Sequence, residues 1–225
     1  MKQSASRRVL VRPLVAAFVL LSGLFAAVAG NAADLQQGLA DIQHRWAEAN
    51  YELEGGAQKD AFERLSKDAA ALVAAHPGRA EPLVWQGIVL STYAGVKGPF
   101  GAMKLAKQSR DALHAAEKLD PSVLHGSVYT SLGALYYKVP GGLIGFGDRD
   151  RARQYLEKAL SMNPDGIDPN YFYGEFLFEE KEYDAARQAL QHALEAAPRP
   201  DRTVADQGRR AEIRELLSKV EKKAG

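Results

Sequence analysis

The chain has 225 residues, a formal charge of +1 and no cysteine. Disulfides, thiolate metal sites and cysteine-linked lipid anchors are therefore excluded, and a near-neutral charge is not the footprint of a nucleic-acid-binding protein. With 46% hydrophobic residues, the chain is long enough to bury a sizeable core as one domain.

The first 29 residues have the layout of a secretory signal peptide. Residues 2–12 carry four basic and no acidic side chains, and residues 14–28 are almost entirely apolar. Ala27-x-Ala29 offers a cleavage site of small residues. We expect residues 1–29 to be removed and the mature chain, with a charge of about −3, to be periplasmic.

Two alternatives to ordinary secretion stay open. A retained transmembrane anchor is one, although an apolar run of about 15 residues is short for a span of roughly 20. Export through the twin-arginine route is the other, because Arg7 and Arg8 are adjacent. We expect the general secretory route and no stable membrane anchor after cleavage.

A repeated pattern follows, and its last two copies end at Pro164 and Pro198, 34 residues apart. In each copy a glycine, Gly133 or Gly174, lies on the apolar stripe of one helix, and an Ala-x3-Leu-x2-Ala segment follows on the next. Small residues on facing stripes let two antiparallel helices approach closely, and a proline ends the second helix. Gly87 begins an earlier copy that ends at Pro121.

This pattern resembles the tetratricopeptide repeat (TPR). The resemblance implies an all-α fold, a right-handed αα-superhelix of about three to four helical hairpins with a C-terminal capping helix. We expect one solenoid domain over residues 34–225, with repeats at about 39–77, 80–121, 125–164 and 168–198 and the capping helix at about 203–223. The resemblance also implies a scaffold that binds a protein or peptide partner, and not an enzyme.

The second and third repeats are longer than the fourth, which predicts enlarged turns inside their hairpins. Both inserts are rich in glycine and proline, and both carry apolar side chains: Val96 and Phe100 in the first, and Val139, Leu143, Ile144 and Phe146 in the second. Insertions at the same point of successive repeats emerge on one edge, so we expect the two loops to be neighbours. They either pack on the protein or contact a partner.

The first helices of the repeats are expected to line a concave groove, as they do in TPR proteins. Counting along the pattern, the inward positions are Glu81, Val84, Ile88, Thr130, Tyr137, Asp168, Tyr171, Glu175 and Phe178. This lining is apolar and acidic, and the Lys, Arg and Asn that clamp a carboxylate in some TPR domains are missing from it. Such a groove favours a basic or amphipathic peptide.

No motif predicts catalysis, a metal or a cofactor. The glycines between Gly141 and Gly147 lack the Lys-Ser/Thr of a phosphate-binding loop. Asp165, Asp168 and Asn170 have some spacing of a calcium loop but not its glutamate, so Asp168 is expected to cap a helix that starts at Pro169. Asp148 is expected to cap the helix after the second insert.

Two further resemblances concern the function. About 30 residues from Leu132 to Leu160 are similar to the T-component of TRAP transporters, a periplasmic TPR protein, which implies the alternative of a transport accessory that binds a small hydrophobic solute. The segment from Arg202 to Ile213 resembles the ending of bacterial TPR proteins that carry no known activity. Nothing in the pattern names the partner.

Overall fold

The structure is a computed structural model that describes residues 16–224, with side chains for 32–223. Residues up to Gln37 form one unit and residues Gly38–Gly225 another, and the second contains the candidate site. The basic segment of the expected signal peptide lies outside the described residues. Among the residues described, no helix is both long enough and apolar enough to span a membrane.

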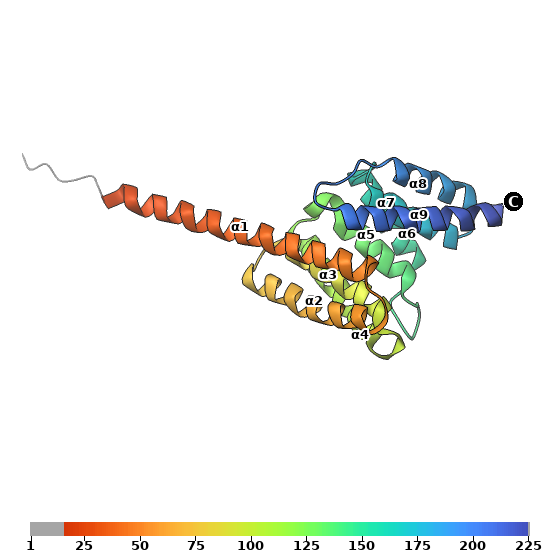
Figure 1. Ribbon diagram of the computed structural model, residues 1–225, viewed down its shortest axis with the longest axis horizontal. Coiled ribbons are helices and arrows are strands. Elements are labelled where there is room, and N and C mark those ends of the chain that lie inside the picture. The colour runs from red at the N-terminus through yellow and green to blue at the C-terminus, as the bar shows by residue number, and fades with distance from the viewer. Residues whose placement is uncertain (1–15, 225) are drawn as a thin grey trace, which may run out of the picture. The chain divides into compact units, whose positions relative to one another are not determined.

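The described elements are helices joined in consecutive antiparallel hairpins, and an all-α TPR superhelix is confirmed (Figure 1). The bounds are α1 Ala16–Tyr51, α2 Gly55–Ala75, α3 Ala80–Lys97, α4 Pro99–Leu119, α5 Val123–Lys138, α6 Arg149–Met162, α7 Ile167–Glu179, α8 Tyr183–Glu195 and α9 Thr203–Ala224. The pair α3–α4 falls within the second predicted repeat range, and the pairs α5–α6 and α7–α8 begin two residues and one residue before the third and fourth ranges.

The glycines of the repeated pattern lie where the two helices of a hairpin touch. A Cβ atom at Gly87, Gly133 or Gly174 would lie 2.5, 2.6 or 2.7 Å from the Cγ of a leucine on the partner helix. Those leucines are Leu113, Leu156 and Leu190, and all three are fully buried. The predicted close approach of the helices is confirmed, and its cause is the missing side chain.

The insert in the second repeat is not the enlarged turn that its sequence suggests. Residues 95–97 continue α3, and Pro99 already begins α4 after the single residue Gly98, whose φ is +79°. A kink at Phe100 and Gly101 then reorients the chain within α4. Glycine supplies the positive φ and proline suits a first helical position, so these residues turn the chain tightly and the insert lengthens both helices.

The insert in the third repeat does form a loop, over residues 139–148. Its two ends are tied together, because the Gly147 N–H donates to the Pro140 carbonyl at 2.9 Å and the Asp148 N–H to the Tyr136 carbonyl at 2.9 Å. A Cβ at Gly147 would lie 1.9 Å from the Val139 oxygen. The glycines therefore serve close backbone packing within the loop. Asp148 caps α6 as predicted, since its Oδ1 accepts from the Arg151 N–H at 3.0 Å.

The last helix, α9, packs against α7 and α8 (Figure 1). Arg210 donates to the carbonyls of Leu194 and Ala196 at the C-terminal end of α8, where backbone acceptors have no helical partner. Ile213 and Val220 are fully buried in the core that the hairpins share. This helix also carries arginines toward the first helices of the repeats.

Candidate binding site

A cavity of about 630 Å³ lies among the first helices of the hairpins. Its walls come from the C-terminal part of α1, from α3, α5 and α7, from the start of α4, and from α9 with the segment before it. That volume is in the range of small-molecule sites.

Aromatic side chains form much of the wall. Both tryptophans of the chain, Trp46 and Trp85, line the cavity with Tyr51, Tyr171 and Phe172. The rings of Trp46 and Trp85 meet edge to face with centroids 6.1 Å apart, and Trp46 donates its indole N–H to Thr92 Oγ1 at 3.0 Å. These walls suit an apolar or aromatic ligand body.

Asp168 anchors an ion-pair network at the other side of the cavity. Its carboxylate accepts from Arg199 at 2.6 Å and from Arg209 at 2.9 Å. The expectation that Asp168 caps α7 is wrong, because the helix begins at Ile167 and its N-cap position is Gly166. Although burial raises the pKa of Asp168, the charges of Arg209 and Arg199 outweigh it and lower that pKa to about 2.

The network continues through α9 and back to α1. Arg199 also pairs with buried Asp206 at 2.6 Å, and Arg209 with Glu212 at 2.6 Å. Tyr51 donates to the same Glu212 carboxylate at 3.3 Å. The Arg209 guanidinium lies 4.3 Å from the centroid of the Tyr171 ring. The network thereby joins α1, α7 and α9 around the cavity.

Arg202 differs from the two arginines beside it. It is partly buried and lies 5.1 Å from the centroid of the Trp85 ring, and its Nη1 donates to Gln43 Oε1 at 3.3 Å. Among the described residues no carboxylate lies within 4.0 Å of it, in contrast to Arg199 and Arg209. Burial and the charge of Arg199 lower the pKa of Arg202.

Four of the predicted groove residues line this cavity: Ile88, Thr130, Asp168 and Tyr171. The other five lie elsewhere. Val84 is fully buried in the core, and buried Tyr137 donates to Glu175, which also pairs with Lys138 at 2.7 Å.

The remaining two predicted groove residues, Glu81 and Phe178, contact other side chains outside the cavity lining. Glu81 pairs with Arg79, and Phe178 packs on Tyr183. Counting along the pattern identified the first helices of the repeats. It did not distinguish the helix face that lines the cavity from the faces that pack against neighbouring helices.

The sequence predicts an apolar and acidic groove, but the lining of this cavity contains more basic than acidic side chains. Lys138, Arg199, Arg202 and Arg209 all reach the cavity, against the carboxylates of Asp168 and Glu212. The three arginines lie after the last repeat, outside the positions counted from the pattern. The signal that could have found them is the basic and acidic segment from Arg202 to Ile213, whose charges a capping helix alone does not require.

The apolar side chains of the two inserts divide between packing and exposure. Val96 and Val139 line the cavity, and Phe146 packs against Tyr136 and under the Arg110 guanidinium. Phe100 is 92% exposed, Ile144 is 73% exposed and Leu143 is fully exposed. Some apolar side chains of the inserts therefore pack on the protein, and others are exposed to solvent.

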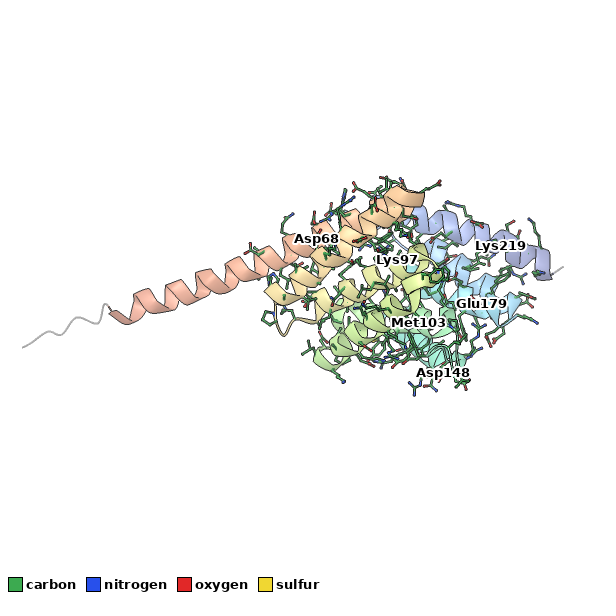
Figure 2. The ribbon with its side chains drawn as sticks, turned by 90° about the horizontal axis from the view of Figure 1, so that it is seen from below. Asp68, Lys97, Met103, Asp148, Glu179 and Lys219 are labelled. Carbon is green, nitrogen blue, oxygen red and sulfur yellow. The ribbon has the colours of Figure 1, made fainter. Side chains whose placement is uncertain are left out.

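The two inserts are neighbours, as their matching positions predict. A Cβ at Gly145 would lie 3.1 Å from the terminal methyl of Met103 on α4. Figure 2 labels Met103 near Asp148, which lies at the lower edge of the molecule in that view. We call the exposed side chains of Phe100, Leu143 and Ile144 the loop surface.

Metal binding has no support in the part of the chain that the structure describes. Within residues 16–224, no three or more His, Asp or Glu side chains are gathered as metal ligands. The site is an aromatic cavity with an arginine-rich side.

Stacked antiparallel helical hairpins, closed by a further helix, define a helical-repeat protein. Residues 143–206 match the family model of the tetratricopeptide repeat. This part of the chain is similar to the tetratricopeptide repeat, and the described helices have the fold of a TPR superhelix. Comparison with curated proteins gives no match.

One solved structure aligns with a TM-score above 0.5, and two others align with lower scores. TTC0263, a thermophilic TPR protein of Thermus thermophilus, aligns with a TM-score of 0.54 and 17% identity over 83% of this chain and 98% of its own. MamA aligns with a TM-score of 0.43 and 18% identity over 75% and 91% of the two chains. The pilF protein of Pseudomonas aeruginosa aligns with a TM-score of 0.35 and 15% identity over 81% of this chain and 91% of its own.

Proposed function

We propose that this chain is an exported scaffold that binds a protein partner at the loop surface. The observation that carries the proposal is the exposure of Phe100, Leu143 and Ile144 on the two inserts, which approach each other at Gly145 and Met103. Exposed apolar side chains on inserted segments are typical of interaction sites. TPR proteins in general bind protein partners, which supports the same class of function.

Site-specific photocrosslinking tests the loop surface. A photoreactive amino acid is placed at Ile144 in cells of the source organism, alone or with Phe100→Ser and Leu143→Ser. We expect a crosslinked partner band that the double variant reduces strongly. Leu119→Ser is the matched control, because Leu119 is also a large exposed apolar residue but lies at the end of α4.

The comparison of the double variant with Leu119→Ser shows whether the loop surface is specific. A band that the double variant and Leu119→Ser reduce equally, or that neither reduces, would contradict a specific loop surface. Circular dichroism of each purified variant checks that the helices are intact.

Export is the second part of the proposal and is supported by the sequence of residues 1–29. We expect the periplasmic fraction to contain a chain that begins just after Ala29, and N-terminal sequencing measures this. Export by the general secretory route is expected to survive Arg7→Lys with Arg8→Lys. A full-length chain confined to the cytoplasm would overturn export, and loss of export in the double variant would favour the twin-arginine route.

The second candidate function is binding of a small solute, and one observation favours it. The cavity has the volume and the aromatic walls of a small-molecule site, and Val96 and Val139 of the inserts help to line it. A role as a TRAP-type transport accessory draws only on the sequence likeness around Leu132–Leu160. The case for solute binding depends on the cavity and not on that likeness.

A further inference from the structure

Two buried N–H donors in the cavity wall have no acceptor among the described residues. They are the indole Nε1 of Trp85 and the Nε of Arg202. Trp85 is 5% exposed, and the Arg202 guanidinium lies over its ring. Buried donors are normally hydrogen-bonded, so two unbonded donors on stacked side chains of one cavity wall call for an acceptor from outside the described residues.

The contrast with neighbouring groups shows that the arrangement is specific to this spot. The other tryptophan of the cavity, Trp46, is satisfied by Thr92. Arg199 and Arg209 each hold two carboxylates, whereas Arg202 holds only the neutral amide of Gln43. Arg202 is therefore the guanidinium that is best placed to bind an anion from outside the chain.

The chemistry of the two donors selects the ligand headgroup. A guanidinium presents parallel N–H groups that match the two oxygens of a carboxylate, and an indole offers one further donor. Neither group can accept a hydrogen bond, so the ligand atom that faces them must be an acceptor. An alcohol or amide oxygen can accept one such bond but carries no charge, whereas a carboxylate offers two charged acceptor oxygens.

The charges around the cavity limit the ligand to a single negative charge. Four cations, Arg199, Arg202, Arg209 and Lys138, are balanced by four carboxylates that belong to the network or pair with Lys138: Asp168, Asp206, Glu212 and Glu175. A dianion such as a phosphate would leave a large excess of negative charge in a partly buried site. A monoanion adds only half of that excess and is therefore tolerated better.

We propose that the cavity binds a small amphiphilic carboxylate, with its headgroup on Arg202 and Trp85 and its apolar body against the aromatic wall. The body would lie along Trp46, Tyr171 and Phe172, which face the same cavity. This inference rests on the second candidate function, which is binding of a small solute in the cavity. It adds the chemical class of that solute. It does not depend on the loop surface.

Titration with octanoate tests the proposal on the full mature chain. Both tryptophans line the cavity, so intrinsic tryptophan fluorescence reports its occupancy directly. We expect a saturable change with octanoate, and affinity at least about tenfold weaker for 1-octanol and octanamide, because a charged hydrogen-bonded pair is lost. Octyl phosphate is the dianionic comparison and is expected to bind more weakly than octanoate.

Three variants locate the headgroup. Arg202→Gln is expected to weaken octanoate binding about tenfold or more and to leave octanol binding unchanged. Trp85→Phe keeps the ring and removes the donor, so its loss is expected to be smaller. Arg214→Gln is the matched control, because Arg214 is an exposed arginine on α9, the helix that begins directly after Arg202, and its replacement should change nothing.

Each result is decisive. Octanoate and octanamide of equal affinity, or octanoate binding unaffected by Arg202→Gln, would leave a solute cavity but overturn the carboxylate. No saturable change with octanoate, decanoate or 3-phenylpropionate up to about 10 mM would overturn the solute site as well. If Arg202→Gln alters the circular dichroism spectrum, Arg202→Lys replaces it, because lysine keeps the charge and loses the planar pair of donors.

Discussion

Asp168 shows how one carboxylate can stabilise the fold from the edge of a binding site. It bonds Arg199 and Arg209, which come from the segment before α9 and from α9 itself. Arg209 is 7% exposed, and removing one partner of a buried pair leaves the other charge without compensation. The network thereby fastens the last helix to α7.

Replacing Asp168 with Asn is expected to lower the free energy of unfolding at neutral pH by about 2–4 kcal/mol. The folded pKa of about 2 lies below the ordinary value of 3.8. A depressed carboxyl pKa stabilises the folded state above pH 4, and that stabilisation is lost as pH falls from about 4 to about 2. Urea unfolding of both chains across this range measures the difference.

The matched control is Asp111→Asn, because Asp111 forms an exposed ion pair with Arg110 on α4. Such a pair contributes less than about 1 kcal/mol, so the control should unfold almost like the parent chain. A stability difference for Asp168→Asn that stays constant from pH 7 to pH 2 would contradict the ion-pair explanation.

At the scale of the elements, the hairpins depend on glycines that face leucines. Gly133 lies in α5 where Leu156 of α6 is fully buried, so Leu156 has little room to move away from an added methyl group. The other hairpins repeat this contact at Gly87 and Gly174. Close packing of this kind makes the hairpin the unit of the fold.

Gly133→Ala is expected to lower the free energy of unfolding by about 1–2 kcal/mol, because overpacking exceeds the gain in helix propensity. Gly95→Ala is the control, since Gly95 lies in α3 with nothing within 4 Å of an added Cβ. This control should be neutral or up to about 1 kcal/mol more stable. Equal stability of the two variants in urea unfolding would contradict the role given to the close contact.

The elements were readable from the sequence because their causes are local. Helical spacing of apolar residues and the glycine–leucine contacts recur with the repeat, and Asp148 caps α6 from an adjacent position. The turn at Gly98 was misread, since glycine and proline fit a long loop as well as a one-residue turn. Only the course of the backbone distinguishes the two.

The site was predictable only in part, because a cavity depends on contacts between distant segments. Ile88, Thr130, Asp168 and Tyr171 were found since they lie on first helices of the repeats. Arg199, Arg202 and Arg209 were missed because α9 and the segment before it bring them back to the cavity from beyond the last repeat. Their effect reversed the expected character of the lining from acidic to arginine-rich.

At the scale of the whole site-bearing unit, residues 38–225, the repeats provide two separate surfaces. The cavity is enclosed by first helices and α9, and the loop surface lies on the edge formed by the inserts. Val96 and Val139 belong to the inserts and also line the cavity, so the two places share structural elements. A ligand and a partner could therefore be held side by side.

The central claim is that the cavity holds a small amphiphilic carboxylate in the cell. Native mass spectrometry of the chain purified from the periplasm of its source, beside the Arg202→Gln variant, tests it most directly. The account predicts a parent chain with an added mass of a few hundred daltons, identified as a carboxylic acid after release, and a variant largely without it. The same added mass on both chains, or the bare mass on both, would contradict the account.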